Sequence, residues 1–87
     1  MLSLTHAARQ LISEMLANAA QGMVLRISAT QEGPHISTDR VRVGDDTFNY
    51  GGKCVLAVDQ MVLRNIAGDT LDVDVVDGQS QLMLTSA

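Results

Sequence analysis

The sequence is short of several residue types. Cys54 is the only cysteine among its 87 residues, and a single thiol cannot form a disulfide within the chain. This favours a reducing environment, so a cytoplasmic location is expected. Phe48 and Tyr50 are the only residues of the Phe, Tyr and Trp class. The core must therefore be aliphatic, and no aromatic platform is available on which nucleic-acid bases could stack.

Charge and hydropathy exclude two further classes of partner. Six basic residues are scattered along the chain against ten acidic ones, which gives a net charge of −4. No basic stripe results, so nucleic acid is not expected as a partner. No membrane association is expected either, because no apolar run approaches the roughly 20 residues that span a bilayer and no signal-peptide pattern follows Met1. Since 46% of the residues are hydrophobic, the sequence predicts a single globular domain over residues 1–87.

An amphipathic helix is predicted near the N-terminus. Apolar residues recur there at helical spacing and form one stripe that can pack against a sheet. They are Leu4, Ala8, Leu11, Ile12, Met15, Leu16 and Ala19. Ser3 or Thr5 can cap the start, because a side-chain oxygen there accepts a hydrogen bond from a free backbone N–H. Residues 18–22 are predicted to end the helix, with Gly22 suited to a left-handed conformation.

The middle of the chain has the pattern of short strands. Residues 23–29 alternate and are rich in β-formers, residues 30–34 have loop chemistry, and residues 35–43 return as a second strand. On that second strand, Ile36 is the clearest candidate to point inward.

Two more strands and a short helix are predicted next. Residues 47–50 and 53–58 form the strands, each after a glycine-containing turn. Asp59 is then placed to cap a short helix over residues 60–65.

The last segment predicts a β-hairpin. Residues 71–75 alternate strictly, Asp77 and Gly78 interrupt the pattern, and residues 79–85 resume it. An Asp-Gly pair between two strands favours a two-residue type I′ turn. That turn implies a specific register, which pairs Val76 with Gln79, Val73 with Leu82 and Leu71 with Leu84. One helix followed by short strands predicts a mainly β fold of the α+β class, a sandwich or a distorted barrel with a helical turn before the final hairpin.

Four short motifs resemble the HesB-like, A-type iron–sulfur cluster assembly domains. Leu4-Thr5 with Ala7-Ala8 and Ile12 is similar to that family's opening, and Gly22-x-x-Leu25-Arg26-Ile27 is similar to its first strand. Residues 53–59 resemble the strand before its short helix, and residues 68–73 resemble the element after that helix. Each motif is weak alone, and their order and spacing over nearly the whole chain carry the resemblance.

The resemblance implies the family's fold without the family's cysteine ligands. Carriers of this family hold iron or a [2Fe–2S] cluster on three cysteines, and an ungapped alignment from Leu25-Arg26 places the first of them on Pro34, which has no ligand atom. The other two would come as Cys-Gly-Cys beyond Ala87. The chain is therefore expected to be a cysteine-poor, non-catalytic member without a resident cofactor. It would be an accessory or interaction module that forms a homodimer and has protein partners in iron–sulfur assembly.

An alternative interpretation gives the chain replacement ligands. Cys54, the one soft donor, lies in an apolar strand where a cysteine usually packs as a small hydrophobe. If it faces outward, Cys54 and His35 could bind iron or a [2Fe–2S] cluster across a dimer interface. His6 is expected to be solvent-exposed, and the carboxylates of residues 69–77 are explained by a solvated strand face. No catalytic triad, phosphate loop or His-Glu-x-x-His motif is present, so an enzyme is not expected.

A third interpretation, a general protein-interaction domain unrelated to metals, would be marked by an exposed apolar patch.

Overall fold

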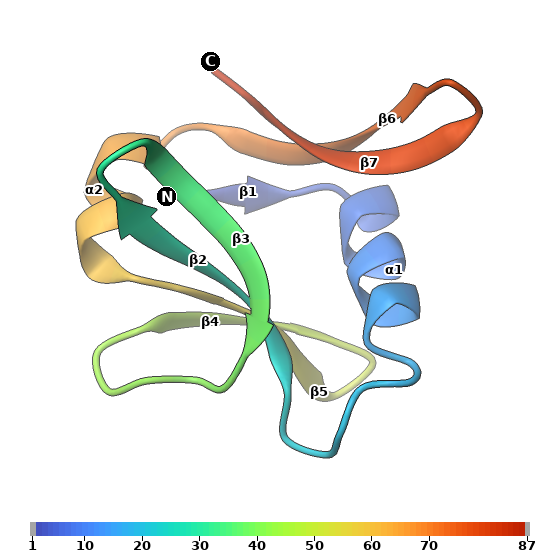
Figure 1. Cartoon of the computed structure of the whole chain (residues 1–87), viewed down its shortest axis with the longest axis horizontal. Coiled ribbons are helices and arrows are strands. Elements are labelled where there is room, and N and C mark those ends of the chain that lie inside the picture. Colours follow the sequence, from blue (N-terminus) through green and yellow to red (C-terminus); the bar gives the residue numbers. More distant parts are fainter. Residues whose placement is uncertain (1, 87) are drawn as a thin grey trace.

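The computed structural model describes residues 2–86 and contains seven strands and two helices in that range (Figure 1). The elements follow one another along the chain as β1 (Ser3–Leu4), α1 (His6–Met15), β2 (Val24–Thr30), β3 (Gly33–Asp39), β4 (Asp46–Tyr50), β5 (Lys53–Val58), α2 (Gln60–Ile66), β6 (Thr70–Val76) and β7 (Gln79–Thr85). Neither helix has the length and apolar composition needed to cross a membrane.

The strands form two separate mixed sheets. One has the order β1-β6-β7 and the other β3-β2-β5-β4, with parallel pairing between β1 and β6 and between β2 and β5. The predicted mainly β, α+β class is confirmed. Of the two alternatives, the barrel is wrong, because the two described sheets do not close on each other.

One hydrophobic core lies between the two sheets and the two helices. Its members are buried aliphatic side chains, most of them from α1, β2, β5, α2 and β6, which explains how a chain with so few aromatic residues can fold. They are Leu2, Ala8, Ile12, Leu16, Leu25, Ile27, Val55, Leu56, Val58, Val62, Ile66 and Leu71. The inward face of the predicted N-terminal helix is confirmed at Ala8 and Ile12, whereas Met15 is 51% exposed.

The N-terminal helix is shorter than predicted at both ends. Residues Ser3 and Leu4 form a strand instead, because they pair in parallel with Thr70 and Leu71. Thr5 is the cap, since its Oγ1 accepts from the Ala8 N–H at 3.1 Å, so the alternative cap at Ser3 is wrong. The helix ends at Met15, and the chain continues in tighter turns whose N–H groups bond three residues back rather than four.

The second predicted strand is also shorter. β3 ends at Asp39, so Val41 and Val43 lie in a loop, where they are 44% and 107% exposed. Ile36 pairs with Ile27 on β2 but is 36% exposed, because β3 is the edge of its sheet and the core does not extend beneath it. Ile36 is therefore not a buried core residue, contrary to the prediction from the sequence.

The C-terminal predictions are confirmed. β5 covers the predicted residues, Asp59 caps α2, and its Oδ1 accepts from the Met61 N–H at 2.8 Å. β6 and β7 have the predicted register, including Val73 opposite Leu82. Asp77 and Gly78 have φ values of 52° and 79°, which are the two positive φ values that a type I′ turn requires.

Candidate functional site

The β2–β3 hairpin ends where the resemblance places the family's first cysteine. Thr30 pairs with Gly33 across a two-residue turn, and the Thr30 hydroxyl donates to the Gly33 carbonyl at 2.6 Å. Gly33 has φ 114°, a conformation that a side chain would strain. Pro34 follows inside β3, where a residue without an N–H is tolerated because β3 is an edge strand. The hairpin is thus built by turn chemistry and presents no thiol.

A small cavity of about 130 Å³ lies between this hairpin end and α2. Its lining residues come from both elements and offer two polar side chains but no thiol, imidazole or carboxylate. They are Ala29, Thr30, Gly33, Pro34, Val62 and Asn65. Iron and iron–sulfur clusters are held mainly by thiolates and imidazoles, so this lining does not fit such a group.

The two predicted ligands do not meet within one chain. His35 is exposed on β3 opposite Ser28, whereas Cys54 is half-buried on β5, two residues before Leu56, which pairs with Leu25. Counted along the strands, their levels differ by five residues, or roughly 17 Å, and they lie two strands apart. The Cys54 Sγ lies 3.8 Å from the Leu56 carbonyl oxygen, a weak contact within its own strand. Nowhere in residues 2–86 do three His, Cys, Asp or Glu side chains come close enough to hold a metal ion.

The other polar residues that the sequence singles out either make structural contacts or face solvent. His6 is exposed, as expected, and its ring centre lies 5.6 Å from that of Tyr50. Asp72 accepts a hydrogen bond from the Thr5 hydroxyl at 2.9 Å, which links β6 to the start of α1. Asp74 is exposed, as expected for a solvated strand face.

A buried ion cluster was missed by the sequence analysis. Arg26 lies on β2 and is only 5% exposed, and its Nε and Nη2 each donate to one carboxylate oxygen of Asp45 at 2.8 Å. The Arg26 Nη2 also lies 3.4 Å from Asp59, the residue that caps α2. Asp45 further accepts from the backbone N–H of Arg42 at 2.9 Å. The cluster therefore fastens the loop before β4 and the start of α2 to the central strands.

The hydrogen bonds between Arg26 and Asp45 favour the charged form of both side chains. The hydrogen bond from Arg26, strengthened by the Arg42 N–H, keeps the pKa of Asp45 below its usual value despite burial. The hydrogen bond to Asp45 raises the pKa of Arg26 above its usual value. Arg26 and Asp45 therefore form a structural pair that holds the loop before β4 against β2. The sequence does hold a signal for this cluster. An arginine lies inside a strand of apolar residues, and aspartates follow it in two later loops.

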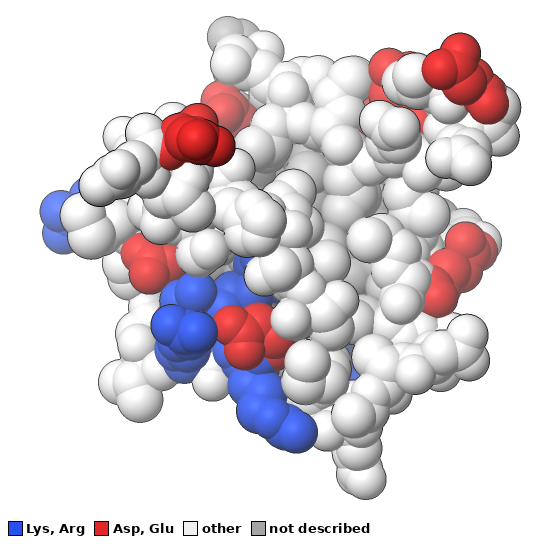
Figure 2. All heavy atoms as spheres, in the orientation of Figure 1, with Lys and Arg blue, Asp and Glu red and all other residues white. Residues whose placement is uncertain are grey.

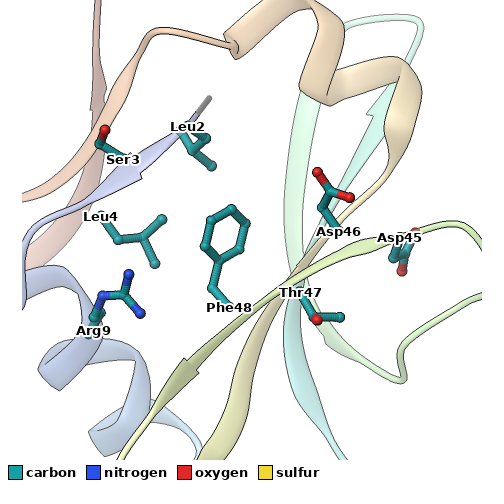
Figure 3. A pocket seen from close by; sticks show the side chains of 8 residues that line it. All are labelled: Leu2, Ser3, Leu4, Arg9, Asp45, Asp46, Thr47 and Phe48. Atoms are coloured by element: carbon teal, nitrogen blue, oxygen red, sulfur yellow. The ribbon is translucent and has the colours of Figure 1, made fainter.

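A larger open cleft of about 690 Å³ lies between β1 and β4, the neighbouring edges of the two sheets. Figure 3 shows Leu2, Leu4 and Phe48 pointing toward one another, with Arg9 at one end and Asp46 at the other. Arg9 donates from Nη1 to the carbonyl of Asn49 and so links α1 to β4 at that end of the cleft. The lining combines apolar and charged groups but has no thiol or imidazole, so it has no donors of the kind that bind clusters.

The charges on the surface are mixed. Figure 2 shows the basic side chains on this face gathered beside acidic ones rather than in a basic stripe. One such pair is Arg42, which donates from Nη2 to Asp39 at 3.1 Å and is exposed.

No protein-family model matches the sequence, and no curated protein matches it. Solved structures do match. Escherichia coli SufA, which is involved in the biosynthesis of iron–sulfur clusters, aligns with a TM-score of 0.78 at 24% identity over 98% of this chain and 84% of its own. The chain has the HesB-like fold. IscA with a [2Fe–2S] cluster aligns at TM-score 0.65 and 15% identity, over 99% of this chain and 82% of its own.

A protein from Aquifex aeolicus also shares the HesB-like fold. It aligns at TM-score 0.67 and 22% identity, over 99% of this chain and 91% of its own. The fold expected from the four motifs is therefore confirmed, and the sequence is a cysteine-poor example of it, with one cysteine in 87 residues. A fold hosts different activities, so what this chain does must be argued from its own residues.

Proposed function

We propose that this chain is a non-catalytic HesB-fold protein that holds no iron–sulfur cluster on its own side chains and acts as an accessory or interaction module in iron–sulfur assembly. One observation carries this proposal: the possible donors, Cys54 and His35, lie at different levels and on different strands of one sheet. The fold supports a role in iron–sulfur assembly, because the matched SufA and IscA structures are named for cluster biosynthesis and for a [2Fe–2S] cluster. A cytoplasmic location and a single domain are part of the same proposal.

Native mass spectrometry after anaerobic incubation with ferrous iron and sulfide tests the first half of the proposal. We expect the wild type and Cys54→Ser to show the same metal-free mass, with E. coli SufA in the same reaction as the positive control. A mass increment for iron or [2Fe–2S] in the wild type that Cys54→Ser abolishes would overturn it. The ligand pair Cys54 and His35 across a dimer interface would then be tested by His35→Ala.

The accessory role needs a second readout. The chain is titrated, without metal, against the cluster-bearing HesB-fold protein of its own source organism, and complexes are detected by native mass spectrometry. We expect a mixed complex that leaves the cluster on the partner. A mixture that shows only the separate proteins at concentrations well above cellular levels would contradict the accessory role.

A further inference from the structure

The cleft between β1 and β4 has opposite charges at its two ends. Its volume of about 690 Å³ lies within the range of about 300–1,000 Å³ that is usual for ligand sites. Arg9 lies at one end and Asp46 at the other, with the half-buried side chains of Leu4 and Phe48 pointing toward one another between them (Figure 3). Among residues 2–86 the ion pairs involve other side chains, so neither Arg9 nor Asp46 has a partner of opposite charge. The cleft therefore fits an extended ligand with an anion at one end, a cation at the other and an apolar group between them.

β4 also offers free backbone groups along this cleft. Tyr50 adjoins the two-residue turn of the β4–β5 hairpin, so its N–H and C=O groups bond β5. Alternation along β4 then turns the N–H and C=O groups of Thr47 and Asn49 away from β5. The bond from Arg9 to the Asn49 carbonyl agrees with this direction. The unpaired residue of the irregular register is Val55 on β5, so β4 itself keeps its alternation. Because β4 is the edge of its sheet, it can receive an added strand there.

We propose that this edge binds the C-terminal tail of a partner protein as an added strand parallel to β4, and that the tail ends in a basic residue, any residue, and an apolar residue with its free carboxylate. Adding a strand to a sheet edge and capturing a terminal carboxylate are both known ways to recognise peptides. The charges set the direction, because a cation at Asp46 and an anion at Arg9 make the tail run the same way as β4. Arg9 sets the end of the tail, since its side chain occupies the edge beside Asn49 and blocks a longer strand.

Each of the last three residues of the tail has a defined contact. In a parallel ladder, the Thr47 N–H and C=O bond the residues before and after the one opposite Thr47. The first of the three residues then lies level with Asp46, and the last lies level with Phe48 and covers its half-buried ring. The terminal carboxylate is placed to accept from the Asn49 N–H and from Arg9, which has N–H donors besides the one that bonds Asn49.

The spacing of the charges argues for a peptide rather than a single amino acid. From the level of Asp46 to that of Asn49, β4 rises roughly 10 Å. The ammonium and carboxylate groups of a free amino acid are attached to one carbon atom, so they cannot reach both ends of the cleft. Three residues of extended peptide span roughly this length. Binding of such a tail needs no metal or cluster, so this inference does not rest on the proposed function.

The test is fluorescence anisotropy of an N-terminally labelled hexapeptide that ends in lysine, serine and leucine with a free carboxyl group, titrated with the metal-free protein. We expect saturable binding with a dissociation constant below about 1 mM, and at least about tenfold weaker binding of the same peptide with an amidated C-terminus. Arg9→Gln and Asp46→Asn should each weaken binding of the carboxylate peptide at least about fivefold. The matched controls Arg64→Gln and Asp74→Asn, at exposed positions outside the cleft, should bind like the wild type.

Asp46→Lys separates loss of recognition from loss of folding. It should bind a hexapeptide that ends in glutamate, serine and leucine at least about fivefold more tightly than the wild type does, because both charges at that end are exchanged. The proposal would be overturned if the wild type showed no saturable binding of the lysine peptide, or bound the amidated peptide equally well. Undiminished binding by Arg9→Gln and Asp46→Asn, with folding checked by circular dichroism, would overturn it too. So would binding of free leucine as tight as that of the peptide, because the ligand would then be a single amino acid.

Discussion

Replacing Arg26 by methionine should destabilise the fold severely. Arg26 donates two hydrogen bonds to Asp45, whose side chain is only 2% exposed, so Arg26→Met leaves a buried carboxylate with the Arg42 N–H as its remaining partner. Removing one member of a buried ion pair costs about 3–5 kcal/mol. A chain of this length has a total stability of about 4–13 kcal/mol. Urea denaturation followed by circular dichroism should therefore show a large fall in the unfolding midpoint.

A double variant tests whether the unpaired buried carboxylate causes the loss of stability. Arg26→Met with Asp45→Asn removes the unpaired charge, so it should be more stable than the sum of the two single losses by at least about 1 kcal/mol. The matched control is Arg42→Met, because the Arg42 side chain is 65% exposed and its pair with Asp39 is at the surface. Its unfolding midpoint should equal that of the wild type. A loss below about 1 kcal/mol for Arg26→Met would refute the reasoning.

The same cluster predicts opposite pH dependences for wild type and variant. In the wild type, Arg26 lowers the pKa of Asp45 below its unfolded value of about 3.9. This stability is present above that pH and is lost as the pH falls through the folded pKa. In Arg26→Met, burial without the arginine raises the Asp45 pKa instead, so the variant loses stability as the pH rises. The difference in unfolding free energy between the two proteins should therefore be smaller at about pH 3 than at about pH 7.

Three other substitutions follow from local contacts and can be measured by the same urea titration. Thr5→Ala removes the cap of α1 and the bond to Asp72 and should cost about 1–2 kcal/mol, whereas Thr5→Ser should retain most of that stability. Gly78→Ala places a side chain at φ 79° in the type I′ turn and should cost about 1–2 kcal/mol. Leu56→Ala empties a fully buried position and should cost about 2–5 kcal/mol. An unchanged midpoint in any of them would contradict the contact it removes.

The parts of the fold that were predicted correctly are specified by neighbouring residues. Asp77 and Gly78 determine the turn, and the turn determines every pair of the β6–β7 ladder, so the sequence sufficed for the register. The cap at Asp59 is equally local, because its carboxylate bonds an N–H two residues later.

The parts that were missed depend on residues far apart in the chain. Ser3 and Leu4 continue a helical pattern and become a strand only because β6 offers them partners. The pair of Arg26 and Asp45 was missed because Asp45 comes 19 residues after Arg26 and no local pattern links the two. Whether Cys54 and His35 meet in one chain likewise depended on strand order, which one sequence does not specify. Their role across two chains stays a prediction.

The pairing of β1 with β6 also constrains how the protein is made. Thr5 and its partner Asp72 are 67 positions apart, and the Ser3 and Thr5 N–H groups bond carbonyls of residues 69 and 71. At a synthesis rate of about 5–20 residues per second, β1 leaves the ribosome roughly 3–13 seconds before its partner strand. During that interval β1 has no partner strand and α1 has no bond to β6. The β1-β6-β7 sheet can form only after β6 has been translated, so this part of the fold is completed well after the N-terminal residues have been made.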